Sequence, residues 1–292
     1  MSRLKPLLTF SNPPLLALAV LTYALGAGIA RYLGRANNPL LFGLGFIWIL
    51  LLFLAMSLLT IYFRPHNEPL VKGETIKEQN WLRAALFQVS IAALGIAALL
   101  FVTFLQMGVS PPAIFYAVLI FLTALIYALP PLRLATNGFG ELALAVLIAL
   151  LIPAFSLSLQ MGEIHRLLGA FSFPLVALSL AYFLVLDFPT YKEDRKYERG
   201  NLLFRIGWQR AIPLHHILIL TAYFLFATMP QFGFPWAIIG PVFLVMPFAL
   251  FEIYWMQEIA SGSNPNWRFL KIIATTVIGL TLYIITFTLW TR

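Results

Sequence analysis

Nine apolar runs constrain this chain more than any other feature of its sequence. A helix of about 20 apolar residues spans the hydrocarbon core of a bilayer. The runs cover approximately residues 14–34, 40–63, 84–106, 111–130, 142–161, 169–187, 211–229, 234–256 and 270–290. Membrane-spanning β-strands would instead need segments of about ten residues with alternating polarity. Because the runs are too long and too uniform for strands, we predict an all-α integral membrane protein with about nine transmembrane helices.

Composition and charge support the same class of protein. Hydrophobic residues make up 61% of the chain and charged residues 10%, whereas a soluble protein is about a quarter charged. The absence of cysteine excludes disulfides, thiol nucleophiles and cysteine-ligated metals. All but four of the 19 Lys and Arg residues lie in the N-terminal segment or in loops that follow even-numbered spans. The four exceptions are Arg31, Arg35, Arg166 and Arg292.

This charge distribution predicts the topology. Loops rich in Lys and Arg stay in the cytoplasm, so we expect a cytoplasmic N-terminus. The net charge of +8 then reflects topology rather than nucleic-acid binding. We expect one polytopic domain over residues 1–292, multi-pass in the cell (inner, cytoplasmic) membrane. Its cytoplasmic loops are predicted at about 64–83, 131–141 and 187–210, and loops on a rigid scaffold commonly carry function.

The loop at 187–210 carries the most concentrated polar chemistry. Asp187 and Asp194 are seven residues apart, two helical turns on one face, with Thr190 between them. A carboxylate at the end of a span is costly unless it is paired, solvated or bound to a cation, and Mg²⁺ prefers oxygen ligands. The basic residues that follow, which could bind a diphosphate, are Lys192, Arg195, Lys196 and Arg199. The alternative is a solvated loop whose acids pair with nearby bases.

The other two loops add fewer candidates. The loop at 64–83 contains no aspartate, and Asn67 and Glu68 are its possible cation ligands, close to Arg64. The stretch "YALPPLRLATNGFGEL" begins at Tyr127 and places Arg133 just after a double proline that ends the preceding helix.

Polar residues within the later spans are expected to be structural. His215 and His216 are adjacent and point apart on a helix, so they make a poor metal pair. Glu252 lies near the end of the eighth run, where we expect it to anchor the helix at the membrane interface.

Two of these stretches resemble motifs of the UbiA superfamily of intramembrane prenyltransferases. "YALPPLRLATNGFGEL" is similar to the family's helix 4–5 turn, Y-[ST]-x-P-P-L-[KR]-L-K-x-R-G-x-G-E-L. "DRKYERGNLLFRIG" is similar to the D-R-x-x-G-K-x-T-L-x-V-R-L-G that ends the second aspartate motif. With nine helices and cytoplasmic motif loops, the resemblance covers nearly the whole chain.

The resemblance implies a chemistry and a site. In the family, aspartate motifs hold Mg²⁺ ions that bind the diphosphate of an isoprenyl donor. When the diphosphate departs, it leaves an allylic cation, which an aromatic or other acceptor captures at the lipid interface. Asp187 and Asp194 become the predicted catalytic residues. The predicted metal ligands are Asp187, Asp194, Glu193, Glu68 and Asn67. The predicted diphosphate-binding residues are Arg64, Arg133, Lys192, Arg195, Arg199 and Tyr127.

The departures from the family pattern keep two functions open. Neither register tested for the first aspartate motif, which belongs at the end of the second helix, contains an aspartate, and Arg64 lies in that region. Thr190 replaces an aspartate of the second motif, Glu198 a glycine and Asn201 a threonine. The chain is therefore predicted to be a prenyltransferase with a reduced Mg²⁺ site. The alternative is a non-catalytic protein that binds an isoprenoid or quinone lipid or acts as a subunit of a membrane complex. A transporter is disfavoured because no inverted repeat is evident.

Overall fold

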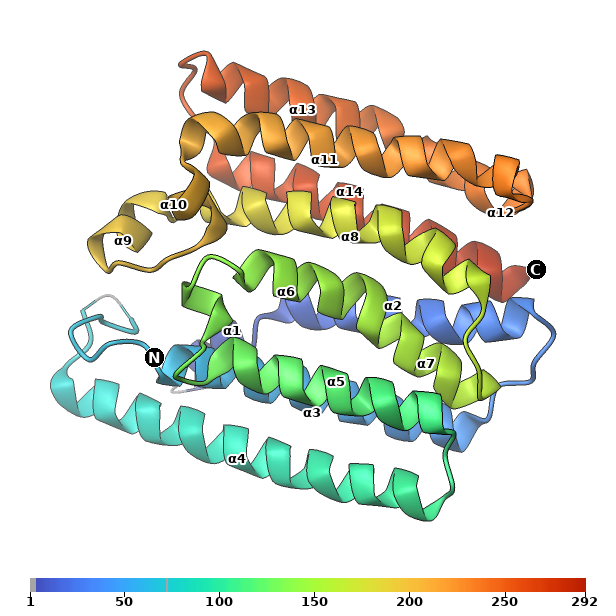
Figure 1. Cartoon of the computed structure of the whole chain (residues 1–292). Coiled ribbons are helices and arrows are strands. Elements are labelled where there is room, and N and C mark those ends of the chain that lie inside the picture. The colour runs from blue at the N-terminus through green and yellow to red at the C-terminus, as the bar shows by residue number, and fades with distance from the viewer. Residues whose placement is uncertain (1–3, 72) are drawn as a thin grey trace.

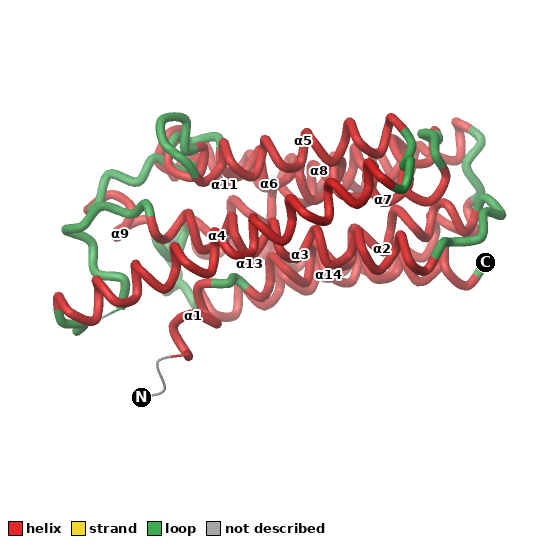
Figure 2. Tube along the Cα trace, turned by 90° about the horizontal axis from the view of Figure 1, so that it is seen from below, coloured by secondary structure: helices red, strands yellow, loops and turns green. Residues whose placement is uncertain are grey.

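Long helices run along one common axis and form a bundle (Figures 1 and 2). The computed structural model describes residues 4–71 and 73–292, and nine helical segments in that range are long and apolar enough to cross a membrane. They are α2 (Pro13–Tyr32), α3 (Pro39–Tyr62), α4 (Ile76–Gln106), α5 (Pro111–Ala128), α6–η2–α7 (Gly140–Met161), α8 (Arg166–Asp187), α11–η3 (Trp208–Phe232), α12–η4–α13 (Trp236–Ala260) and α14 (Trp267–Thr291). The predicted all-α fold of a multi-pass membrane protein is confirmed.

Short helices complete the described chain. They are α1 (Leu4–Phe10), η1 (Leu134–Thr136), α9 (Tyr191–Lys196) and α10 (Leu202–Ile206). The predicted connection at 187–210 contains α9, α10 and the start of α11. In Figure 1, α1, α9 and α10 lie at one end of the bundle, whereas the C-terminus lies at the other.

Local capping determines where several helices begin. The Asn38 side chain accepts hydrogen bonds from the backbone N–H groups of Leu40 (3.0 Å) and Leu41 (3.2 Å) at the start of α3. At the start of α4, Thr75 and Glu78 form a capping box in which each side chain accepts from the other's backbone N–H. This box starts α4 at Ile76, so residues 76–83, which precede the apolar run that predicts this span, are helical.

The fifth span changes its helical pitch halfway. It consists of α6 (Gly140–Val146), a π-helical turn η2 (Leu147–Leu151) and α7 (Ile152–Met161). Pro153 has no N–H to donate to the preceding turn, and a π-turn is one way in which a helix accommodates such a break. Glu141 lies in α6, before this π-turn, and the largely buried α7 follows the π-turn.

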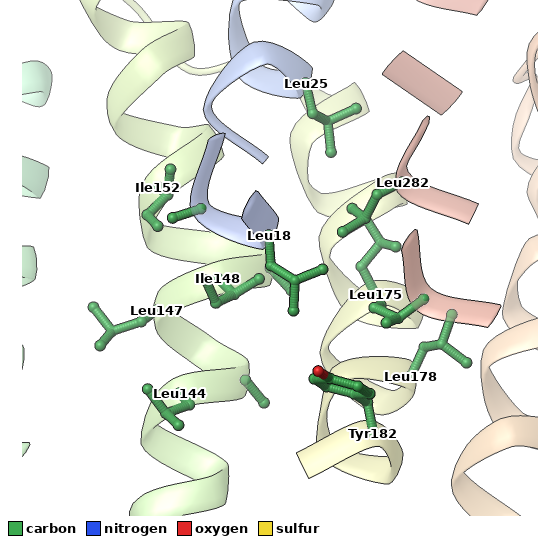
Figure 3. Packing of buried hydrophobic residues seen from close by; sticks show 14 of the residues in the cluster. Leu18, Leu25, Leu144, Leu147, Ile148, Ile152, Leu175, Leu178, Tyr182 and Leu282 are labelled. Atoms are coloured by element: carbon green, nitrogen blue, oxygen red, sulfur yellow. The ribbon is translucent and has the colours of Figure 1, made fainter. Parts of the chain in front are cut away.

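Helix α2 lies at the centre of the packing and contacts α3, α7 and α14. A Cβ atom at Gly26 would overlap the carbonyl oxygen of Pro153, so glycine allows the close approach of α2 to α7. Figure 3 shows Leu18 of α2 between the α6–α7 segment and α8, where it is buried among other apolar side chains. By contrast, large apolar side chains are exposed on the outside of the bundle, as a lipid environment requires; examples are Leu99, Phe115, Phe224 and Tyr283.

A buried pair of polar side chains lies inside the described part of the membrane-spanning bundle. His215 of α11 and Glu252 of α13 are 0% and 2% exposed, and His215 Nε2 lies 3.0 Å from Glu252 Oε1. Glu252 is thus a buried partner of His215, and our expectation that it anchors α13 at the interface was wrong. Its carboxylate is held by a side chain of the neighbouring helix because lipid offers it no hydrogen bonds.

Candidate functional site

A cavity of about 420 Å³ opens at the end of the bundle that carries α9 and α10. Its walls come from the start of α2, the last turn of α3 and the loop after it, and the end of α5. They are completed by the turn between α5 and α6, called the 4–5 turn because it joins the fourth and fifth spans, by the start of α6, the end of α8 and the segment around α9. Polar and charged side chains come from the loops, from the helix ends beside them and from α9. Apolar and aromatic walls come from the helices, through Leu15, Leu144, Tyr182, Phe183 and Leu186. Such a cavity can accept a ligand with one charged and one apolar part.

The two loops that form the mouth of the cavity contact each other directly. Asn137 and Gly200 form a parallel bridge, and the backbone N–H of Gly138 donates to the carbonyl oxygen of Gly200. A Cβ atom at position 200 would lie 2.7 Å from the carbonyl oxygen of Thr136, so only glycine permits this approach. The contact holds the segment after α9 beside the 4–5 turn.

Arg199 connects two carboxylates across the cavity mouth. Its Nε donates to Glu68 Oε2 (3.2 Å), its Nη2 donates to Glu68 Oε1, and its Nη1 donates to Asp194 Oδ1 (3.0 Å). Arg64 Nη1 also contacts Glu68 Oε1 (3.1 Å). The carboxylates are deeply buried, since Glu68 is 1% and Asp194 4% exposed. Buried charges of this kind are stable only when they are paired and hydrogen-bonded.

The remaining oxygen of Asp194 is held by two neighbours. Asp194 Oδ2 accepts from Thr190 Oγ1 (2.7 Å) and from Asn201 Nδ2 (2.9 Å). Thr190 and Asn201 are two of the positions at which the sequence departs from the second aspartate motif. In this chain, those departures supply hydrogen-bond donors to the retained aspartate.

Arg83 of α4 holds the loop that carries Glu68. Its guanidinium donates to the carbonyl oxygens of Tyr62 (2.7 Å), Arg64 (2.8 Å) and Pro65 (2.9 Å). These acceptors lie at the C-terminal end of α3 and just beyond it, where a positive charge is favourable. Our sequence reasoning used Arg83 only for topology; its place two helical turns into α4, beside the loop after α3, was the signal for this role.

Arg133 enters the cavity from the 4–5 turn. Its backbone adopts a left-handed conformation with φ of 36°, which is unfavourable for a residue with a side chain. Its Nη2 makes a long contact with the carbonyl oxygen of Thr60 (3.4 Å), and its buried Nε has no acceptor within the described residues. Strained residues with unused donors are commonly found at binding sites.

The arginines differ in their electrostatic surroundings. Burial and the neighbouring charge of Arg199 lower the pKa of Arg64, and burial lowers the pKa of Arg133. Burial would also lower the pKa of Arg199, but its hydrogen bonds and charge interactions with Glu68 and Asp194 raise it instead. Arginine stays protonated in proteins, so the cavity mouth holds three positive side chains, of which Arg199 is the most fully paired.

A second acidic group lies on the opposite side of the cavity. Asp187 at the end of α8 and Glu141 in the first turn of α6 both line it and are close enough to interact electrostatically. Asp187 Oδ2 and Glu141 Oε2 are buried and lack a hydrogen-bond partner among the described residues. Glu141 was missing from our predicted site because a glutamate at a helix N-terminus has an ordinary capping explanation.

The predicted site residues therefore divide into two groups. Those that line the cavity are Arg64, Glu68, Tyr127, Arg133, Asp187, Asp194 and Arg199. Those that are exposed outside it are Asn67, Lys192, Glu193 and Arg195. Within the described chain, no three Asp, Glu or His side chains come together in a way that could hold a metal ion. Because Arg199 already occupies Glu68 and Asp194, the predicted ligand set does not fit Mg²⁺ as it stands.

Structures of three related proteins or complexes share the fold. A UbiA homolog from Archaeoglobus fulgidus superimposes with a TM-score of 0.65 at 16% identity, covering 99% of this chain and 100% of that chain. The same homolog bound to GPP and Mg²⁺ gives 0.59 at 17% identity, with coverage of 96% and 99%. A digeranylgeranylglyceryl phosphate synthase gives 0.60 at 13% identity, with coverage of 100% and 98%.

Sequence comparison settles the family. No curated protein matches the chain. A sequence model of the UbiA prenyltransferase family matches residues 64–273, which include all three predicted loops and the described walls of the cavity from Arg64 onward. This match extends over most of the sequence, and the chain belongs to the UbiA prenyltransferase family.

Proposed function

We propose that this chain is a membrane prenyltransferase that takes an isoprenyl group from a prenyl diphosphate bound in the cavity. The observation that carries the proposal is the division of the cavity into a charged mouth and an apolar interior. Arg64, Arg133 and Arg199 lie at the mouth, and Leu144 and Phe183 are among the interior side chains. Guanidinium groups bind phosphate oxygens through paired N–H donors, and the interior suits a hydrocarbon tail.

The reaction follows from this placement. The allylic C–O bond of the donor breaks, and the diphosphate leaves with the electron pair while the arginines offset its developing charge. The acceptor's electron-rich atom forms a bond with the allylic cation and then loses a proton. Asp187 and Glu141 each keep one buried oxygen without a hydrogen-bond partner in the described chain, and these oxygens are available in the cavity to receive that proton. The acceptor enters from the lipid interface on the predicted cytoplasmic side of the cell membrane.

The bound homologs support this proposal. Structures of the Archaeoglobus fulgidus homolog contain GPP with Mg²⁺ or DMAPP with Mg²⁺, so a protein with this fold binds prenyl diphosphates. The present chain shares 17% identity with it, and the donor assignment therefore rests on the cavity of this chain together with the family.

The test is binding of geranylgeranyl diphosphate to the purified full chain in detergent, followed by transfer to candidate acceptors. We expect Arg133→Ala to weaken binding by about 10- to 100-fold, because a charge-assisted hydrogen bond contributes about 1.5–3 kcal/mol. Arg205→Ala is the matched control, because Arg205 lies over the ring of Phe139 at 4.3 Å, outside the cavity. Equal affinity of both variants and the wild type would contradict the proposed site.

A non-catalytic lipid-binding role is the second candidate. The pairing of Glu68 and Asp194 with Arg199 favours it, because these carboxylates are no longer free for a metal. Such a protein would bind geranylgeraniol, which lacks the diphosphate, as tightly as geranylgeranyl diphosphate, and would form no transfer product. A strong preference for the diphosphate supports the enzyme instead.

A further inference from the structure

The charged mouth of the cavity contains one cluster whose carboxylates the proposed reaction does not explain. It consists of Arg64, Glu68, Asp194 and Arg199, which we call the arginine cluster. Glu68 comes from the loop after α3, whereas Asp194 comes from α9, and the two carboxylates meet on opposite sides of the Arg199 guanidinium. Two buried carboxylates brought together from separate loops require a positive charge between them.

Arg199 provides that charge in a way that leaves little room for another cation. Both oxygens of Glu68 accept from Arg199, and Glu68 Oε1 also contacts Arg64. Asp194 Oδ1 accepts from Arg199, and its Oδ2 accepts from Thr190 and Asn201. A divalent ion needs several of these oxygens as ligands. It could reach them only by displacing Arg199, which would break at least three charge-assisted contacts.

The neighbouring arginines are left available for an anion. Arg133 has a buried Nε without an acceptor in the described chain, and it lines the same cavity as Arg64. Arg64 has one carboxylate contact, so the rest of its guanidinium can bind a ligand. The cluster therefore presents fixed positive charge where a phosphate group would lie.

From this arrangement we infer that Arg199 takes the place of a divalent cation and that the chain binds the diphosphate of its ligand without Mg²⁺. The inference rests on the proposed function for the identity of the ligand. It differs from that function in a specific requirement: diphosphate affinity should depend on Arg199 and not on a metal ion.

Asp187 and Glu141 define the competing possibility. They are the acidic side chains of the cavity whose buried oxygens lack partners among the described residues. If a divalent ion binds to the wild-type protein within the cavity, it binds there, and the inference is overturned. Titration with Mn²⁺, followed by its electron paramagnetic resonance signal, measures this directly and does not depend on activity.

Two variants distinguish the cation role of Arg199 from general loss of charge. Arg199→Ala frees Glu68 and Asp194, so we expect this variant to gain a Mn²⁺ site that the wild type lacks. Its affinity for geranylgeranyl diphosphate should fall about 10- to 100-fold in EDTA and recover when Mg²⁺ is added. Arg133→Ala is the matched variant: it should lose a similar amount of affinity, but Mg²⁺ should not restore it, because no carboxylate is released.

The wild-type measurement needs no variant and remains decisive if Arg199→Ala does not fold. The dissociation constant of geranylgeranyl diphosphate is compared in EDTA and in Mg²⁺, and we expect the two values to agree within about twofold, less than 0.5 kcal/mol. Binding that requires Mg²⁺ overturns the inference and leaves the proposed function intact. Absence of binding in both buffers overturns the proposed function and this inference with it.

Discussion

Replacing Glu198 by glycine should stabilise the protein. Glu198 has a backbone φ of 52°, in the left-handed region, and its side chain lines the cavity mouth. A left-handed conformation costs a residue with a side chain about 1–2 kcal/mol, whereas glycine loses about 0.5–1 kcal/mol more backbone entropy on folding. The difference predicts a net gain of about 0.5–1 kcal/mol for Glu198→Gly.

The same substitution elsewhere in the segment should have the opposite effect. Glu193 is exposed and lies within the six-residue helix α9, where glycine costs about 0.5–1 kcal/mol. Both variants can be compared with the wild type by equilibrium unfolding in mixed micelles with increasing SDS. If Glu198→Gly destabilises the protein as much as Glu193→Gly does, the left-handed backbone at position 198 does not cost the wild type stability.

The Glu198→Gly variant also tests the cavity. It removes a carboxylate from the cavity mouth, where it would repel a diphosphate, and a partly exposed charge interaction contributes about 0.2–1 kcal/mol. Affinity for geranylgeranyl diphosphate should therefore rise by up to about fivefold. Glu193→Gly should leave it unchanged because Glu193 lies outside the cavity. A parallel change in both variants would refute the assignment of the cavity as the binding site.

Further predictions concern the bundle, and SDS unfolding measures each of them. Gly26→Ala should lower the free energy of unfolding by about 1–3 kcal/mol, because the added methyl group would overlap Pro153. Gly43 faces open space, so Gly43→Ala should not destabilise the protein. Glu252→Leu should cost about 1–3 kcal/mol because it leaves the buried Nε2 of His215 without its partner, and replacing both Glu252 and His215 by leucine should cost less than the sum of the single changes; additive losses would contradict this. Asp187→Asn should stabilise by about 1 kcal/mol or more, because it removes the charge repulsion between Asp187 and Glu141 and gives Glu141 an amide donor; a lower stability would contradict it.

The sequence predicts the spans well because length and hydropathy are local properties. The number of spans and most of their ends follow from apolar runs that a single helix must contain. The difference at the start of α4 has a local cause as well, since residues 76–83 are too polar for a hydropathy window. The Thr75–Glu78 spacing is a capping-box signature that marks the true start, so closer attention to capping would have found it.

The sequence predicts the site less completely because its contacts are not local. Charge patterns suggest pairing between neighbours, and Arg64 with Glu68 is such a pair, four residues apart. The partner of Arg199 in the other loop, Glu68, is 131 residues away. No spacing rule connects them, and the contact depends on how the bundle brings the loop after α3 and the segment after α9 to the same cavity.

The departures from the family motif acquire a common explanation once these contacts are known. Thr190 and Asn201 replace the residues that the motif would place there, and both donate to Asp194. Arg199 takes the other oxygen of Asp194 and joins it to Glu68. Thr190 puts a hydrogen-bond donor where the motif has an aspartate, and Asn201 puts an amide donor where it has a threonine. With Arg199, they leave no oxygen of Asp194 without a partner. Separate random losses would leave unpaired buried carboxylates, which cost far more than this network does. The substitutions therefore act as a set, which is why the reduced acidic motif in this chain indicates a site rebuilt around arginine.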